Sequence, residues 1–166
     1  MKTKKLTLLA LLTGTALILS YVESMLPSAG IPGVKMGLAN IAVIFALYRL
    51  GWREALGISL VRVAMVSALF GSLGALLYSL AGAVLSLTVM ALLRKTDRFS
   101  ETGVSVAGGV AHNAGQILAA WLILKKAEVF SYLPVLIISA IITGLFTGIC
   151  AQEVLRRLRH GLTETP

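Results

Sequence analysis

The sequence predicts an all-α integral membrane protein, a bundle of six transmembrane helices with both termini on the cytoplasmic side. Three features predict this fold class: an apolar composition, six separate apolar runs, and basic residues that gather at alternate ends of those runs. Of the 166 residues, 57% are hydrophobic and 13% are charged, and the mean hydropathy is +0.90. Ordinary soluble domains have about 25% charged residues, and a chain of this length is too small to hide so much apolar surface in a water-soluble core.

The six apolar runs are separated by short polar segments and cover approximately residues 6–26, 37–50, 55–70, 73–93, 104–124 and 132–155. A transmembrane helix needs about 20 residues, with a tolerated range of about 17–25. Four runs meet this requirement, the third is slightly short, and the second is clearly short. The longest intervening segment, 27–36, has two prolines and two glycines and is predicted to form a structured turn. We therefore expect one membrane domain over residues 1–166.

The basic residues predict the orientation. If every run crosses the membrane and the N-terminus is cytoplasmic, eleven of the 15 Lys and Arg residues are cytoplasmic: Lys2, Lys4, Lys5, Arg49, Arg53, Arg94, Lys95, Arg98, Arg156, Arg157 and Arg159. Only Lys35, Lys125 and Lys126 fall outside, and Arg62 lies within the third run. This bias follows the positive-inside rule, so the net charge of +8 indicates orientation in the cytoplasmic membrane of a prokaryote and not nucleic-acid binding.

The basic start of the chain also fits a secretory signal peptide. We expect it to remain as a helix, because the apolar run continues to about residue 26 and no small-x-small cleavage site follows it cleanly.

Several kinds of chemistry are missing from the sequence. There is no P-loop motif for ATP, and Asp97 is the only aspartate, so no aspartate-rich cluster is available to hold Mg²⁺ and a diphosphate. Cys150 is the only cysteine, which excludes an internal disulfide and a cysteine-rich metal site. A Ser-His-Asp triad is not credible, because Asp97 lies in an inner loop and His112 lies deep in the bilayer. We therefore expect no catalytic activity, metal or cofactor.

Polar side chains within the apolar runs are the candidate site. An arginine in hydrocarbon costs at least about 2.5–3.5 kcal/mol, so Arg62 must face protein or water. His112 and Gln116 are four residues apart and share a helix face, which Asn113 flanks. Arg62 and His112 are each predicted to lie at a depth of roughly 14–15 Å from the cytoplasmic side, which favours one shared cavity. The predicted pocket for a polar or anionic ligand from outside comprises Arg62, His112, Asn113 and Gln116, with Asn40, Lys35 and Glu23 at its entrance.

A purely structural interpretation of the same residues stays open. In that interpretation Arg62 pairs with Glu23 or with backbone carbonyls, and His112 forms a hydrogen bond between helices.

Small residues recur at helical spacing. Ala107, Ala111, Gly115 and Ala119 are predicted to form a packing seam opposite the polar stripe, and Gly144 and Gly148 form a GxxxG motif on the last helix. Such spacing allows close helix packing, which drives association in membranes. Packing within the chain is the default expectation. Ala10 and Gly14, near the inner end of the first helix, are instead a candidate groove for a partner helix.

Four segments carry a resemblance to a known family: VKMGLANIAVIFALYRLG (34–51), FSETGVSVAGGVAHNAGQILAA (99–120), YLP (132–134) and TGLFTG (143–148). They closely resemble a bacterial family known as heptaprenyl diphosphate synthase component I, also called the Gx transporter family. The resemblance extends over nearly the whole chain, and the G-L-A-N and A-H-N-x-G-Q motifs are its most specific parts. That family is similar in turn to the substrate-binding (S) components of energy-coupling-factor (ECF) transporters.

The resemblance to S components implies six helices, cytoplasmic termini, and a vitamin-like solute bound near the outer face. It also implies that a small-xxx-small motif on the first helix, at Ala10 and Gly14 here, docks on a membrane subunit coupled to two ATPases. The first functional hypothesis is therefore uptake of a small polar or anionic solute. The alternative is a non-catalytic membrane partner of a heptaprenyl diphosphate synthase, since the aspartate-rich motifs of the catalytic chains are absent. A subunit of a flavin- or quinone-linked electron-transfer assembly is a third interpretation that the sequence leaves open.

Overall fold

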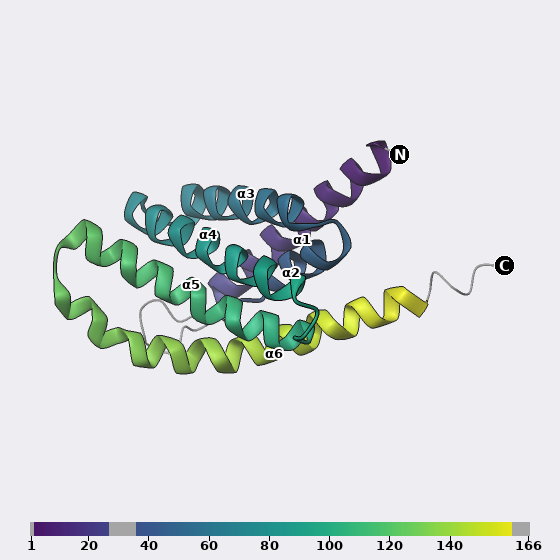
Figure 1. The fold of residues 1–166 in the computed structure, drawn as a ribbon. Coiled ribbons are helices and arrows are strands. Elements are labelled where there is room, and N and C mark those ends of the chain that lie inside the picture. The colour runs from purple at the N-terminus through teal and green to yellow at the C-terminus, as the bar shows by residue number, and fades with distance from the viewer. Residues whose placement is uncertain (1, 27–35, 161–166) are drawn as a thin grey trace.

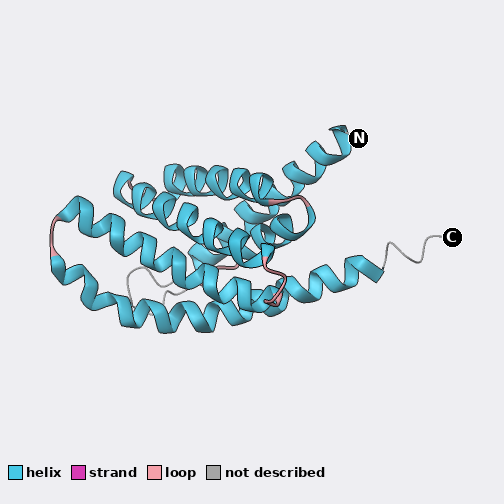
Figure 2. Cartoon of the chain, viewed as in Figure 1, coloured by secondary structure: helices cyan, strands magenta, loops and turns pink. Residues whose placement is uncertain are grey.

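The computed structural model describes residues 2–26 and 36–160, and over these ranges the chain forms helices and no strands (Figures 1 and 2). Its elements are α1 (Lys2–Met25), α2 (Asn40–Arg49), α3 (Trp52–Phe70), α4 (Leu73–Lys95), α5 (Glu101–Leu124), the 3-10 helix η1 (Ala127–Tyr132) and α6 (Leu133–His160). The prediction of an all-helical membrane protein is confirmed. Within the described ranges, four helical stretches are long and apolar enough to cross a membrane: Thr3–Met25, Leu73–Lys95, Glu101–Leu124 and Ala127–Leu158.

Helices α4 and α5 each begin where a serine side chain satisfies one of the first free backbone N–H groups. The hydroxyl of Ser100 accepts a hydrogen bond from the N–H of Gly103 at 3.1 Å, and α5 starts at Glu101, three residues before the predicted apolar run. The hydroxyl of Ser72 accepts one from the N–H of Ala75 at 3.2 Å at the start of α4. Serine is a favoured N-cap because its oxygen accepts from these unpaired donors. Capping, and not hydropathy alone, therefore sets these boundaries.

The start of α1 and the end of α6 lie at the same end of the bundle (Figure 1). Three polar contacts between helices occur at that end. Lys5 at the start of α1 forms an ion pair with Glu54 at the start of α3. Arg94 in the last turn of α4 donates hydrogen bonds to the final carbonyls of α2. Thr102 at the start of α5 donates to Gln152 near the end of α6 at 3.1 Å.

We call this end the basic end, because it carries most of the described basic residues: Lys4, Lys5, Arg49, Arg53, Arg94, Lys95, Arg98, Arg156 and Arg157. Lys125 and Lys126, between α5 and η1, lie at the opposite end (Figure 1). The helices therefore alternate in direction along the chain.

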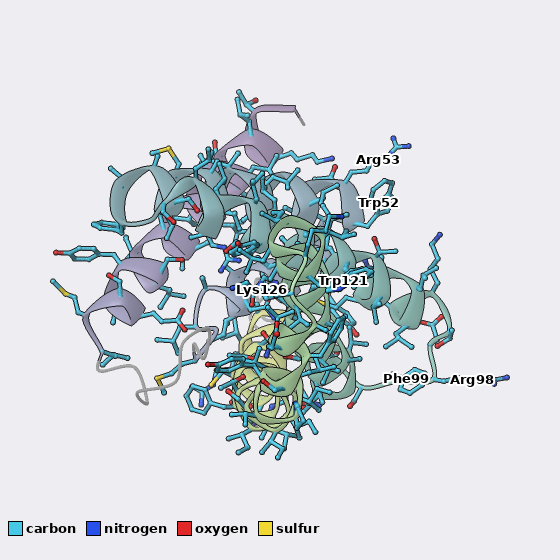
Figure 3. The ribbon with its side chains drawn as sticks, turned by 90° about the vertical axis from the view of Figure 1, so that its left-hand side faces the viewer. Trp52, Arg53, Arg98, Phe99, Trp121 and Lys126 are labelled. Atoms are coloured by element: carbon cyan, nitrogen blue, oxygen red, sulfur yellow. The ribbon has the colours of Figure 1, made fainter. Side chains whose placement is uncertain are left out.

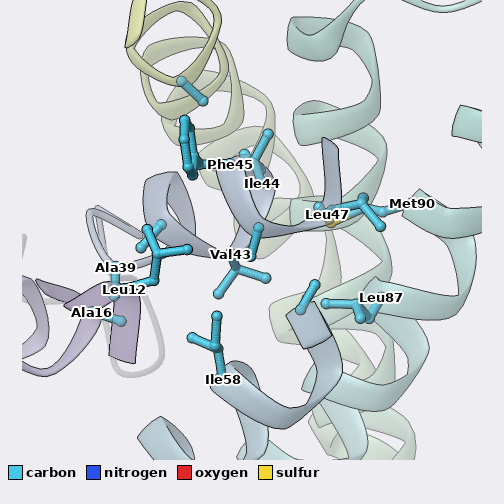
Figure 4. Packing of buried hydrophobic residues seen from close by; sticks show 14 of the residues in the cluster. Leu12, Ala16, Ala39, Val43, Ile44, Phe45, Leu47, Ile58, Leu87 and Met90 are labelled. Carbon is cyan, nitrogen blue, oxygen red and sulfur yellow. The ribbon is translucent and has the colours of Figure 1, made fainter. Parts of the chain in front are cut away.

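The short helix α2 lies at the centre of the core. Its six consecutive residues 42–47 are all buried, and they pack against Leu12 and Ala16 of α1, Ile58 of α3, and Met90 of α4 (Figure 4). A helix that is apolar on every side is a buried helix. At ten residues it is only about 15 Å long, half of the roughly 30 Å hydrocarbon layer. The predicted run 37–50 is thus an internal helix, which does not cross the bilayer by its own length.

The outer surface is apolar as well. On α6, the exposed residues Ile138, Ile142, Leu145 and Ile149 follow one another at helical spacing along a single face. A continuous apolar face of this kind on a soluble protein would mark an interaction surface. On this chain it is the surface that meets lipid. The remaining helices pack in the order α3, α4, α5 and α6, with α1 against α2 and α3 (Figure 1).

Candidate functional site

Arg62 lies on α3 and is half-buried. Its Nε atom is buried and has no hydrogen-bond partner among the described residues. Glu23, near the end of α1, attracts this guanidinium electrostatically, but the two side chains form no direct ion pair. A buried, unsatisfied donor of a charged group costs free energy. Arg62 is therefore the strongest candidate among the described residues for contact with an anionic or strongly polar group.

Glu23 and the backbone of Asn40 both contact Gly37, which precedes α2. The Glu23 carboxylate accepts a short hydrogen bond from the N–H of Gly37, and the N–H of Asn40 donates to the Gly37 carbonyl at 2.8 Å. Gly37 has φ +72°, a left-handed conformation that glycine adopts without steric cost. Two of the three predicted entrance residues, Glu23 and Asn40, thus bind the same glycine, Asn40 through its backbone. The third, Lys35, lies outside the described residues.

His112 and Gln116 face α4. A Cβ atom added to Gly82 of α4 would lie 2.8 Å from the His112 carbonyl oxygen and 3.0 Å from both His112 Cε1 and Gln116 Cγ. Only a glycine fits at this distance. The two side chains therefore lie in the tight contact between α4 and α5.

Asn113 faces a different helix. Its Nδ2 donates a hydrogen bond of 2.7 Å to the carbonyl of Leu136 on α6. This bond satisfies a polar side chain at the contact between α5 and α6. Asn113 thus links two helices, and its side chain does not join those of His112 and Gln116.

That Arg62 and His112 line one shared cavity stays a prediction. Helix α4 packs against both α3 and α5 and lies between them (Figure 1), so Arg62 and His112 are on helices that α4 separates. Equal depth along two helices places residues at one level, but it does not determine which way their side chains point. Glu23 connects the described parts of the candidate site, because it attracts Arg62 electrostatically and accepts a hydrogen bond from Gly37.

The small residues pack within the chain. A Cβ at Gly144 would lie 2.8 Å from the Val106 Cα, and one at Gly148 would lie 2.7 Å from the Thr102 Cα, so the GxxxG motif of α6 packs directly on α5. The predicted seam along α5 is not opposite the polar stripe. Gly115 contacts α4 at Gly82, the same residue that meets His112, so seam and stripe share one face.

Ala10 and Gly14 differ from these glycines. Ala10 is exposed, and a Cβ added to Gly14 would meet no atom within 4 Å. The pair is therefore not used for packing inside the bundle. It remains a prediction that this face of α1 meets a partner.

Arg94 has a role that the sequence did not reveal beyond its charge. Its guanidinium donates to the carbonyls of Leu47 and Tyr48, the second bond measuring 3.1 Å, and lies 5.1 Å from the Tyr48 ring centroid. Helix C-termini leave carbonyls unpaired, and a positive charge there is favourable. Arg94 thus fixes α2 within the bundle. Its position four residues after Met90, a core residue, was the only available signal.

At the same end, the hydrogen bond from Lys5 lowers the pKa of the Glu54 carboxyl below its usual value.

No cluster of three or more His, Cys, Asp or Glu side chains suited to a metal ion occurs among residues 2–26 and 36–160.

Comparison with known proteins identifies one family. The sequence model of the family described as heptaprenyl diphosphate synthase component I matches residues 12–154. No curated protein and no solved structure matches the chain. The matched region extends from α1 into α6, so it includes the central helix α2, Arg62 and the whole of α5.

Proposed function

The chain belongs to the heptaprenyl diphosphate synthase component I family, and from this membership we propose that it is a non-catalytic membrane partner of a separate prenyl diphosphate synthase chain. The family match over most of the chain carries this proposal. The single aspartate supports the non-catalytic role, because it leaves nothing to hold Mg²⁺ and a diphosphate as catalytic chains do. The basic end, which we place in the cytoplasm, is the surface available to a soluble partner.

Co-purification tests the proposal. The tagged chain is expressed together with an aspartate-rich prenyl diphosphate synthase of the same cell, extracted in mild detergent, and recovered through the tag. We expect the synthase to be recovered with it, and membranes that contain both chains to retain prenyl transfer activity after washing. A synthase that stays in the soluble fraction whether or not this chain is present contradicts the proposal.

A second candidate function, uptake of a polar or anionic solute, is favoured by one observation. The Nε of Arg62 is buried and lacks a hydrogen-bond partner in the described part of the chain. Ala10 and Gly14 on the open face of α1 would then dock on an ECF membrane subunit coupled to ATPases.

Native mass spectrometry of the purified chain and of Arg62 variants tests this second function. If Arg62 binds an anionic solute, a small molecule accompanies the unaltered chain and is lost in Arg62→Leu. Arg62→Lys retains it weakly, because a lysine lacks the planar set of five donors. If Arg62 is instead a structural partner of Glu23, Arg62→Leu lowers the melting temperature and Glu23→Gln partly restores it. Bound solute that survives Arg62→Leu removes Arg62 from the site.

A further inference from the structure

An apolar groove of about 180 Å³ lies between α3 and α4 at the basic end. Trp52 and Leu56 line it from α3. The α4 residues that line it have the spacing i, i+3, i+4, i+7, i+8 and i+11 and so form one helix face: Val84, Leu87, Thr88, Ala91, Leu92 and Lys95. That face extends over roughly 16 Å of α4, from Val84 to Lys95. The groove is therefore long and narrow.

The groove is apolar along its walls and cationic at its mouth. The one hydroxyl in its lining, that of Thr88, donates to the Val84 carbonyl at 2.8 Å and is thereby satisfied. Lys95, at the end of α4, is the last of the α4 residues that line the groove, and it is exposed. Arg53 follows Trp52 on α3, and its Cζ lies 5.5 Å from the ring centroid of this groove residue. Neither cation belongs to an ion pair in the described ranges.

Further basic and aromatic groups occur on the same flank. Figure 3 shows Trp52 and Arg53 of α3, and Arg98 and Phe99 from the segment after α4, projecting on one side of the bundle. Aromatic and basic side chains of this kind typically lie at the membrane–water interface. The mouth of the groove is thus at the level where the charged head of an amphipathic molecule would lie.

We propose that this groove binds a long-chain isoprenoid diphosphate, with its hydrocarbon chain against α3 and α4 and its diphosphate at Lys95 and Arg53. This inference rests on the proposed function and names the substrate class for it. A single narrow groove accommodates one branched hydrocarbon chain better than the two chains of a phospholipid. Charge-assisted bonds from two unpaired cations suit a diphosphate. The mouth also opens at the basic end, where a soluble synthase would release such a product.

Tryptophan fluorescence provides the binding assay. The chain has two tryptophans, and Trp121→Phe leaves Trp52 as the reporter in the groove. In nanodiscs of zwitterionic phosphatidylcholine, geranylgeranyl diphosphate should change the Trp52 emission saturably. Geranylgeraniol lacks the charge and inorganic diphosphate lacks the chain, so each should bind at least about tenfold more weakly. Phosphatidylglycerol added to the nanodisc should not displace the diphosphate.

Variants then locate the binding. Lys95→Gln should weaken binding roughly tenfold, the usual size of a lost hydrogen bond to a charged group, whereas the matched Lys126→Gln at the opposite end should not. Ala91→Phe fills the groove and should abolish binding, while Ala75→Phe, on an exposed part of α4, should leave it unchanged. Leu92→Gln changes a 58% exposed wall residue, and should weaken binding in a folded protein even if Ala91→Phe does not fold.

Two results overturn the inference: unchanged binding in both Lys95→Gln and Leu92→Gln, or displacement by phosphatidylglycerol as efficient as by unlabelled isoprenoid diphosphate. The second result would make the groove an ordinary site for anionic lipid. Co-purification with a synthase is measured separately, so a chain that recruits the synthase without groove-dependent binding contradicts only this inference. Groove-dependent binding by a chain that recruits no synthase contradicts only the proposed function.

Discussion

At the scale of single residues, glycine determines how closely α4 and α5 approach. The Gly82 Cα lies where a methyl group would come within 2.8 Å of the His112 backbone carbonyl, and a backbone atom cannot move aside as the end of a flexible side chain can. Gly57 on α3 offers the opposite case, because a Cβ there would meet nothing within 4 Å. Both glycines are inside helices. They therefore form a matched pair that separates helix propensity from packing.

We expect Gly82→Ala to lower the melting temperature in detergent and Gly57→Ala to leave it unchanged or raise it. Alanine gains up to about 1 kcal/mol over glycine inside a helix, whereas forcing an extra methyl group into a packed contact costs about 1–3 kcal/mol. At Gly82 the second effect exceeds the first, and at Gly57 only the first operates. Equal melting temperatures for the two variants would show that α4 and α5 are not held at this distance.

At the scale of the elements, the positions of the helices could be predicted from the sequence, but the faces on which they meet could not. Each apolar run has a helix, because hydrophobic side chains over 14 or more residues allow little else in a membrane. Two helices begin before their apolar runs, α3 at Trp52 and α5 at Glu101, since hydropathy records only the apolar part. The serine at position 100 was the available signal for the second of these.

The same reasoning explains the candidate site. Sequence spacing placed His112 and Gln116 on one face, and the structure places both against Gly82. The spacing gave no information on which helix would lie opposite, and Arg62 was expected in the same cavity because of its equal depth. That α4 packs between α3 and α5 is a property of the order in which the helices pack, and no residue type in α3 or α5 signals that order.

The buried helix α2 provides the prediction at this scale. Ile44 of α2 is fully buried, whereas Ile142 of α6 is 63% exposed. Ile44→Ala removes the same atoms as Ile142→Ala, but it also leaves a cavity in the core, so we expect it to cost about 2–5 kcal/mol and Ile142→Ala much less. Melting in detergent measures both. If α2 were a peripheral lid, the two losses would be similar.

At the scale of the whole molecule, the polar contacts between helices and most of the basic residues lie at the same end of the bundle. The contacts of Lys5, Arg94 and Thr102 hold the N-terminal ends of α1, α3 and α5 and the C-terminal ends of α2, α4 and α6 together at the basic end. Nine of the described basic residues lie there, and cytoplasmic loops are enriched in Lys and Arg. The two ends of the bundle thus differ in charge, and this difference predicts that the basic end is the cytoplasmic one.

Cysteine labelling in intact cells tests this orientation. In a Cys150→Ala background, a cysteine at Ala127, exposed at the start of η1, should react with a membrane-impermeant thiol reagent. A cysteine at Thr96, exposed just after α4, should react only after the cells are permeabilised, because the basic end faces the cytoplasm. Both positions are exposed in the structure, so solvent accessibility alone does not predict different labelling at the two. Labelling at Thr96 in unbroken cells would reverse the orientation, and it would also move the mouth of the α3–α4 groove away from any cytoplasmic synthase.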